Sequence, residues 1–141
     1  MTYAIDTNII FDIFKDDPVF SQPSIDFISG LSVLDNIVAC DVVWAEASAG
    51  FSDKAVFRRR MADIGVTYSP MPEVAAVRAG EMWKRARAEA AKAKSKARLA
   101  VIPDFLVGAH ALECADALIT RDRGFMRQWF SGLTVIDPSA Q

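Results

Sequence analysis

The sequence predicts an α/β protein in which a central, mostly parallel β-sheet is flanked by helices. Two observations support this prediction. Short apolar runs bounded by polar or turn-forming residues recur along the chain and are typical of buried strands. Between them lie stretches whose apolar residues repeat at helical spacing. Strands that alternate with helices form parallel sheets, because each crossover helix packs on a face of the sheet.

The first forty residues predict a strand, two helices and a second strand. Tyr3–Ile5 is an apolar run, and the tripeptide DTN after it offers N-capping oxygens to a helix over Asn8–Phe14. We expect that helix to end near the acidic pair before Pro18. Helical spacing predicts the next helix over Ser24–Leu34, and Asn36–Cys40 is the second buried strand.

The middle of the chain continues the alternation. Asp41 can cap a helix over residues 42–51, and a further helix over Asp53–Ile64 is ended by the following glycine. Val66–Tyr68 is a short strand. A proline at position 72 then suits the start of a long helix that begins at Glu73 and runs into a basic stretch.

The last third predicts one more helix and two strands. Pro103-Asp104 opens the helix FLVGAHALE, and Ala117–Thr120 and Leu133–Ile136 are the remaining strands. The chain has no linker, repeat or break in composition, so we expect residues 1–141 to form one domain.

Composition narrows the class of protein. Hydrophobic residues make up 52% of the chain, which exceeds the usual ~45–50% and suggests a surface for a partner or a dimer. No apolar run reaches the ~18 residues of a membrane span, and the N-terminus lacks the features of a signal peptide, so we expect a cytoplasmic protein. Cys40 and Cys114 match no metal or redox spacing and are expected to be free thiols.

Charge is distributed unevenly. The net charge of −2 argues mildly against a nucleic-acid binder. However, residues 84–98 carry seven basic side chains and one acid. Four of them, Lys92, Lys94, Lys96 and Arg98, are candidate contacts for a nucleic-acid backbone; the alternative is a solvated helix face.

Four acids occupy comparable places in the predicted fold. Asp6 follows the first strand directly, and Asp122 follows the strand Ala117–Thr120 after two residues. Glu46 lies in the first turns of the helix after the second strand, and Asp104 lies at a helix start. Ligands of parallel sheets bind beyond the carboxyl ends of the strands. We therefore expect the four acids to meet at one edge of the sheet.

Such a cluster predicts a cation. Two carboxylates ~4 Å apart near a protein surface repel by about 4 kcal/mol. A domain has only ~5–15 kcal/mol of stability, so it does not tolerate such repulsion among four carboxylates. Oxygen ligands without cysteine or histidine favour Mg²⁺ or Mn²⁺. These ions promote in-line hydrolysis of phosphodiesters. The single histidine, His110, excludes a metal-free ribonuclease that uses two histidines.

At this point four motifs resemble one family, the PIN-domain nucleases. Ile5-Asp6-Thr7-Asn8 is similar to the family's opening signature, and Glu46 within VVWAEASAG is similar to its second acid. The segment 103–111 resembles the helix that carries the third acid, and 118–125 resembles the segment that carries the fourth. The resemblance covers nearly the whole chain in the right order, and its length and layout are most similar to VapC-type toxins.

The resemblance implies a PIN-like three-layer fold and an Mg²⁺- or Mn²⁺-dependent endoribonuclease. It also implies RNA as substrate, a cognate antitoxin protein as partner and a homodimer. Carried over to this chain, Asp6, Asp104 and Asp122 ligate the metal directly or through water, and Glu46 holds a second metal or a metal-bound water. The resemblance assigns orientation of these acids to three neighbours, Thr7, Asn8 and Thr120.

Each candidate also has a structural interpretation. Asp6 and Asp104 suit helix caps, Glu46 suits a solvated helix face, and Asp122 suits a turn. Arg121 and Arg123 either contact substrate phosphates or balance the acids. Acids elsewhere are expected to be caps, turn residues or solvated helix ends: Asp12, Asp16, Asp17, Asp41 and Asp116.

Met82, Trp83 and the single histidine are expected to be buried. Met82 and Trp83 beside the basic run either belong to the core, which we favour, or stack on a base. His110 lies six residues after Asp104, on another side of the helix, and is expected to be packed.

Two other functions compete with the nuclease. One is a non-catalytic binding module that keeps the PIN fold, from which we would expect substitutions within the acid quartet. The other is an aspartyl phosphotransferase, which needs a second aspartate two residues after the first. Position 8 is asparagine and no matching lysine segment exists, so the sequence disfavours it.

Overall fold

A computed structural model describes residues 1–93 and 101–140. The elements follow in this order: β1 (Thr2–Ile5), α1 (Thr7–Phe14), α2 (Ser21–Ser29), β2 (Asn36–Ala39), α3 (Asp41–Ser48), α4 (Lys54–Asp63), β3 (Val66–Tyr68), α5 (Glu73–Lys92), α6 (Ile102–Cys114), β4 (Ala117–Ile119), α7 (Arg123–Trp129) and β5 (Val135–Ile136). The strands form one sheet in the order β3-β2-β1-β4-β5, and every neighbouring pair is parallel. The predicted fold class is confirmed.

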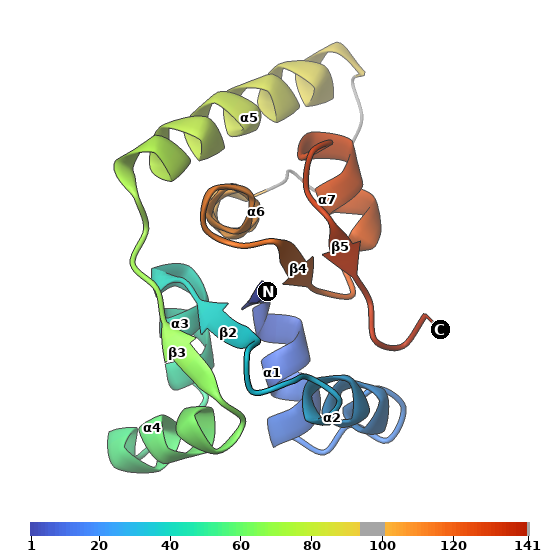
Figure 1. The fold of residues 1–141 in the computed structure, drawn as a ribbon. Helices are drawn as coiled ribbons and strands as arrows, with labels where there is room; N and C mark the ends of the chain where they lie inside the picture. The colour runs from blue at the N-terminus through green and yellow to red at the C-terminus, as the bar shows by residue number, and fades with distance from the viewer. Residues whose placement is uncertain (94–100, 141) are drawn as a thin grey trace.

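The helices enclose the sheet in layers. Figure 1 shows α5 and α6 on one side of the sheet and α1 and α2 on the other, and α3 contacts both α1 and α6. The core between the layers is made of side chains from β1, β4 and α6, among which Ile5, Leu118 and Phe105 are fully buried. Phe105 packs edge to face on Phe125 of α7 with ring centroids 4.9 Å apart, so α6 and α7 share one apolar contact.

Strand register determines which residues meet at the carboxyl edge of the sheet. Ile5 of β1 pairs with Ile119 of β4, and the next residue, Asp6, donates its N–H to the carbonyl of Ile119 at 3.0 Å. Asp6 and Thr120 therefore leave the sheet side by side. The chain order of the strands reverses between β1 and β4, and the crevice at such a switch point is where parallel sheets bind ligands.

Two predicted boundaries are wrong. The helix expected over Ser24–Leu34 begins and ends earlier, at Ser21 and Ser29, and Leu34 is 81% exposed. Asp35 explains the early end, because its carboxylate accepts from the N–H of Ser32 and from the N-terminal amine, both at 2.9 Å, and so stabilises a turn. The seven-residue helix α7 was not predicted, since it is too short to show a helical period.

The other elements agree with prediction to within a few residues. The glycine expected to end α4 is Gly65, which has φ +77 just beyond the helix, a conformation that glycine adopts without strain. Three residues of the basic run, Lys94, Lys96 and Arg98, lie outside the described residues. Within residues 1–93 and 101–140, no helix combines the length and apolar character needed to cross a membrane.

Candidate active site

Asp6 lies at the centre of the candidate site. It occupies the N-cap position of α1 with extended backbone, and its Oδ1 accepts from the N–H of Thr7 at 2.7 Å. Its Oδ2 accepts from the hydroxyl of Thr120 at 2.8 Å and from Nδ2 of Asn8 at 3.4 Å. Asp6 is therefore a helix cap, as its structural interpretation expects, but its Oδ2 is also oriented by two side chains that the site hypothesis named, Thr120 and Asn8.

Thr120 connects the two strands at the switch point. Its side chain is fully buried, and its Oγ1 accepts from Nδ2 of Asn8 at 3.2 Å and from the N–H of Asp122 at 3.0 Å while donating to Asp6. One hydroxyl thus links the acid after β1 to the backbone of the acid after β4.

The other three acids approach from three helices. Glu46, an exposed residue of α3, accepts from the hydroxyl of Thr7 at 3.0 Å. Asp104 lies in the first turn of α6, whose N-cap is Val101, so the interpretation of Asp104 as the cap is wrong. Asp122 occupies the N-cap position of α7, where its exposed side chain makes no capping hydrogen bond.

Electrostatics connect three of these acids. Burial raises the pKa of Asp6 from 3.8 to about 6, against the lowering effect of the hydrogen bonds from Thr120 and Thr7. The negative charges of Asp104 and Glu46 raise this pKa further. Acids that are 40 and 98 residues from Asp6 in sequence therefore act on it through space.

The donor set fits a hard divalent cation. In the part of the chain that the structure describes, no three acid, histidine or cysteine side chains already converge on one point. However, ionised Asp6 is disfavoured by burial and by two neighbouring carboxylates, and a cation between them would reverse both effects. Mg²⁺ and Mn²⁺ prefer carboxylate oxygens completed by water, and Asp6, Asp104, Glu46 and Asp122 would supply such oxygens.

Both arginines beside Asp122 are engaged with acids outside the quartet. Arg121 forms paired bonds to Asp12, at 2.7 Å from Nε and 3.0 Å from Nη2, and Arg123 contacts Asp137 at 3.3 Å. These partners lie outside the four candidate ligands, so contact with substrate phosphates stays a prediction for both arginines. The expectation that Asp12 is a solvated helix end is wrong, because Asp12 is buried against Arg121.

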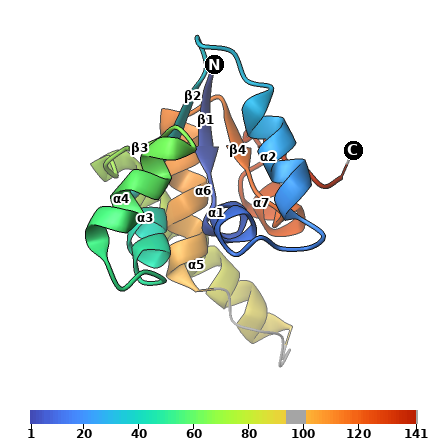
Figure 2. The ribbon, with the colours of Figure 1, turned by 90° about the horizontal axis from the view of Figure 1, so that it is seen from below.

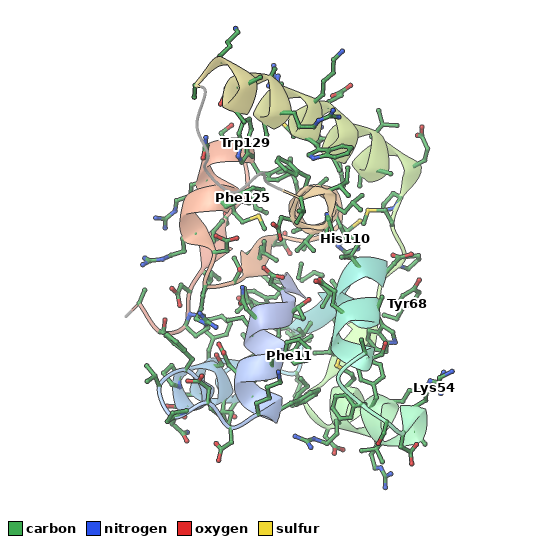
Figure 3. All side chains as sticks on the ribbon, turned by 180° about the vertical axis from the view of Figure 1, so that it is seen from behind. Phe11, Lys54, Tyr68, His110, Phe125 and Trp129 are labelled. Atoms are coloured by element: carbon green, nitrogen blue, oxygen red, sulfur yellow. The ribbon has the colours of Figure 1, made fainter. Side chains whose placement is uncertain are left out.

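A second set of polar side chains, which includes His110 of α6, lies near the residues that follow β2 and β3. His110 is buried, its Nε2 lies 2.9 Å from Oγ of Ser69, and burial lowers its pKa, as expected of a packed histidine. Figure 3 shows His110 on the side of α6 that faces α3 and Tyr68. Asp41 does not cap α3, because Cys40 holds that position; it accepts instead from the N–H of Met71 at 2.7 Å and from the hydroxyl of Tyr68 at 3.1 Å.

The remaining acids and thiols have structural roles. Asp17 accepts from two backbone N–H groups that precede α2, those of Val19 and Phe20, both at 2.9 Å. Asp116 accepts from the N–H of Thr2 at 2.7 Å and so supports the start of β1. Cys40 and Cys114 are free, as predicted.

A basic cleft of about 620 Å³ lies between α5, α6, the end of α7 and the segment that follows α7. Its lining includes Arg85, Lys92 and Trp129, and the two cations are exposed. Figure 2 shows α5 extending beyond the other helices. Met82 and Trp83 are half-buried and pack against the core, which agrees with the interpretation that we favoured.

The fold and the position of Asp6 together define a class: layered α/β proteins with a buried carboxylate at the switch point of a parallel sheet. Within this class, the PIN domain family profile matches residues 3–128, which is most of the chain. The protein belongs to the PIN domain family.

Solved structures of similar fold agree. VapBC-1 from nontypeable Haemophilus influenzae has a TM-score of 0.71 at 21% identity, covering 99% of both chains. A toxin–antitoxin complex from Klebsiella pneumoniae has a TM-score of 0.63 at 21% identity, covering 96% of this chain and 97% of that one. VapBC2 from Rickettsia felis, bound to a promoter DNA fragment, has a TM-score of 0.64 at 19% identity, covering 96% and 98%. No curated protein sequence matches the chain.

Proposed function

We propose that this protein is a divalent-metal-dependent endoribonuclease and the toxin of a toxin–antitoxin pair. The observation that carries the proposal is Asp6, whose carboxylate is held by Thr7 and Thr120. Burial, with smaller contributions from the charges of Asp104 and Glu46, raises its pKa to about 6. A fold does not need a carboxylate that is costly to ionise at this place, whereas a cation-dependent site does.

Some residues of the site would hold the cation, and others orient these ligands. Asp6 and Asp104 would hold the cation from β1 and α6, and Asp122 and Glu46 would complete its shell from α7 and α3. Thr120 fixes the orientation of the Asp6 carboxylate through a 2.8 Å hydrogen bond. When bound, Mg²⁺ or Mn²⁺ supplies Lewis acidity toward the phosphodiester and the attacking water.

Charged and apolar residues on the surface support the proposed substrate and partners. Exposed Arg85 and Lys92 on the cleft beside α7 provide positive charge for an RNA backbone in a protein whose net charge is negative. The solved toxin–antitoxin complex of similar fold supports an antitoxin as protein partner. Exposed apolar residues, among them Val74 and Val77 on α5, support further burial in a homodimer or against that antitoxin.

The test uses partner-free protein and structured RNAs with Mg²⁺ or Mn²⁺, with EDTA, and with single-stranded DNA as a parallel substrate. We expect RNA cleavage that stops with EDTA and in Asp6→Asn. Asp53→Asn is a matched control, since Asp53 is also an N-cap aspartate, at the start of α4, and lies outside the candidate site. Cleavage that persists in EDTA or in Asp6→Asn contradicts the mechanism. RNA binding without cleavage under every condition would identify a non-catalytic binding module.

A further inference from the structure

We propose that Arg121 and Asp12 form a lock that positions Asp122 relative to Asp6. The lock joins the segment after β4 to the middle of α1, across 109 residues of sequence. The inference rests on the proposed function, because it concerns where the fourth acid of the metal site is held. It makes Arg121 and Asp12 positioning residues, which do not themselves touch substrate or cation.

The paired bonds between Arg121 and Asp12 hold the two side chains in one geometry. The guanidinium of Arg121 gives two bonds to the two oxygens of Asp12, 2.7 and 3.0 Å long, in the planar geometry that only arginine provides. The Asp12 side chain is 6% exposed, and the other face of the guanidinium lies 4.1 Å from the ring centre of Phe20. Both ends of the pair are therefore confined, unlike a surface ion pair.

A second contact, one turn away on α1, makes the lock rigid. Asn8 precedes Asp12 by four residues, so both face the same side of the helix. Oδ1 of Asn8 accepts from the backbone N–H of Arg121 at 3.3 Å, and its Nδ2 donates to Thr120 at 3.2 Å. The segment 120–121 is thus attached to α1 at two points, and α1 begins directly after Asp6.

The position of the Asp122 carboxylate depends on this attachment to α1. Its side chain is exposed and makes no capping bond, so the position of its carboxylate follows from its backbone. That backbone is held by the N–H bond to Thr120 at 3.0 Å and by the preceding residue, Arg121. The carbonyl of Asp122 also accepts from the N–H of Met126 at 3.2 Å. Releasing the Arg121 side chain therefore removes the attachment through Asp12 to α1, while the bonds to Thr120 and Met126 remain.

The chain supplies a matched control on the other side of Asp122. Arg123 pairs with Asp137, whose side chain is 7% exposed, but through a single 3.3 Å contact to the segment after β5. Asp12→Asn and Asp137→Asn each neutralise a buried acid paired with an arginine beside Asp122. Only the first breaks an attachment to α1, the helix that carries Asp6.

The experiment measures Mn²⁺ affinity by calorimetry on metal-free protein, with thermal unfolding recorded alongside. We expect Asp12→Asn to weaken Mn²⁺ binding by about 10–100-fold, the range for residues that orient metal ligands. Asp137→Asn should bind Mn²⁺ as wild type does, even if it unfolds at a lower temperature. Arg121→Lys keeps the charge without the paired bonds and should show the same loss as Asp12→Asn.

A double-mutant cycle tests the route of the effect. In an Asp122→Asn background, Asp12→Asn should cause no additional loss of Mn²⁺ affinity, because the lock acts through Asp122. Additive losses, or equal effects of Asp12→Asn and Asp137→Asn, overturn the lock while leaving the metal site intact. Wild-type protein that binds no Mn²⁺ overturns the proposed metal site, and the lock with it.

Discussion

The replacement Asp6→Asn should stabilise the metal-free protein at neutral pH. Burial, followed by the charges of Asp104 and Glu46, raises the pKa of Asp6 from 3.8 to about 6. A group whose pKa is raised on folding contributes stability that is fully present below its unfolded pKa and is lost as the pH rises through its folded pKa. At pH 7 Asp6 is ionised in both states, so the folded state carries the whole cost of the buried charge.

The size of this effect follows from the interval between the two pKa values. Each pH unit corresponds to about 1.4 kcal/mol, so ionised Asp6 costs up to about 3 kcal/mol. Asparagine removes that cost but cannot accept from both Thr7 and Thr120, and one lost hydrogen bond costs about 1 kcal/mol. The net gain is about 1–2 kcal/mol, equivalent to about 3–7 °C in Tm for a chain of this length.

The assay is thermal unfolding of both proteins in EDTA between pH 5 and 8. The advantage of Asp6→Asn should be largest above pH 7 and should shrink toward pH 5, as Asp6 becomes protonated in the folded wild type. Added Mn²⁺ should reverse the order, because only the wild type gains binding energy. A variant that is less stable at pH 8, by an amount that does not depend on pH, would refute the explanation.

Two further predictions concern stability. Burial lowers the pKa of His110, so the neutral imidazole's contribution to stability is present above pH ~6.5 and is lost as the pH falls. The replacement His110→Gln can still bond to Ser69 and should show a weaker decline of Tm from pH 7 to 5. Gly108→Ala places a methyl group 2.6 Å from Cδ2 of Phe130 and should lower stability by about 1–3 kcal/mol in urea unfolding. Gly80→Ala, in a helix and with open space around its Cβ, should instead raise stability by up to about 1 kcal/mol, and the same sign at both glycines would contradict this packing explanation.

The fold class, and the adjacency of Asp6 and Thr120 in the candidate site, could be predicted because both depend on local pattern. Apolar runs mark the strands, and residues that follow parallel strands must meet at one edge of the sheet. Asp6 and Thr120 are adjacent for this reason, through the register of Ile5 with Ile119.

The contacts that hold the site could not be predicted in the same way. Asp12 lies in an acidic stretch near a helix end, and nothing in the sequence indicates that Arg121, 109 residues later, reaches it. Likewise Asp41 has the sequence position of a cap, yet it bonds to Met71 and Tyr68, because the register of β2 with β3 brings that loop beside it. Such pairs depend on tertiary distances rather than on spacing.

The Thr120 hydroxyl has one hydrogen and uses it on Asp6. The hydroxyl also accepts two N–H bonds, which fix its orientation, so Oδ2 of Asp6 always faces a donor. The N–H of Thr7 does the same on the other oxygen. A proton on Asp6 must therefore occupy one of the lone pairs that these donors leave, and those are the lone pairs that a cation would use. Acid and chelator should consequently have the same effect on metal occupancy, since each leaves the Asp6 carboxylate without a metal ion.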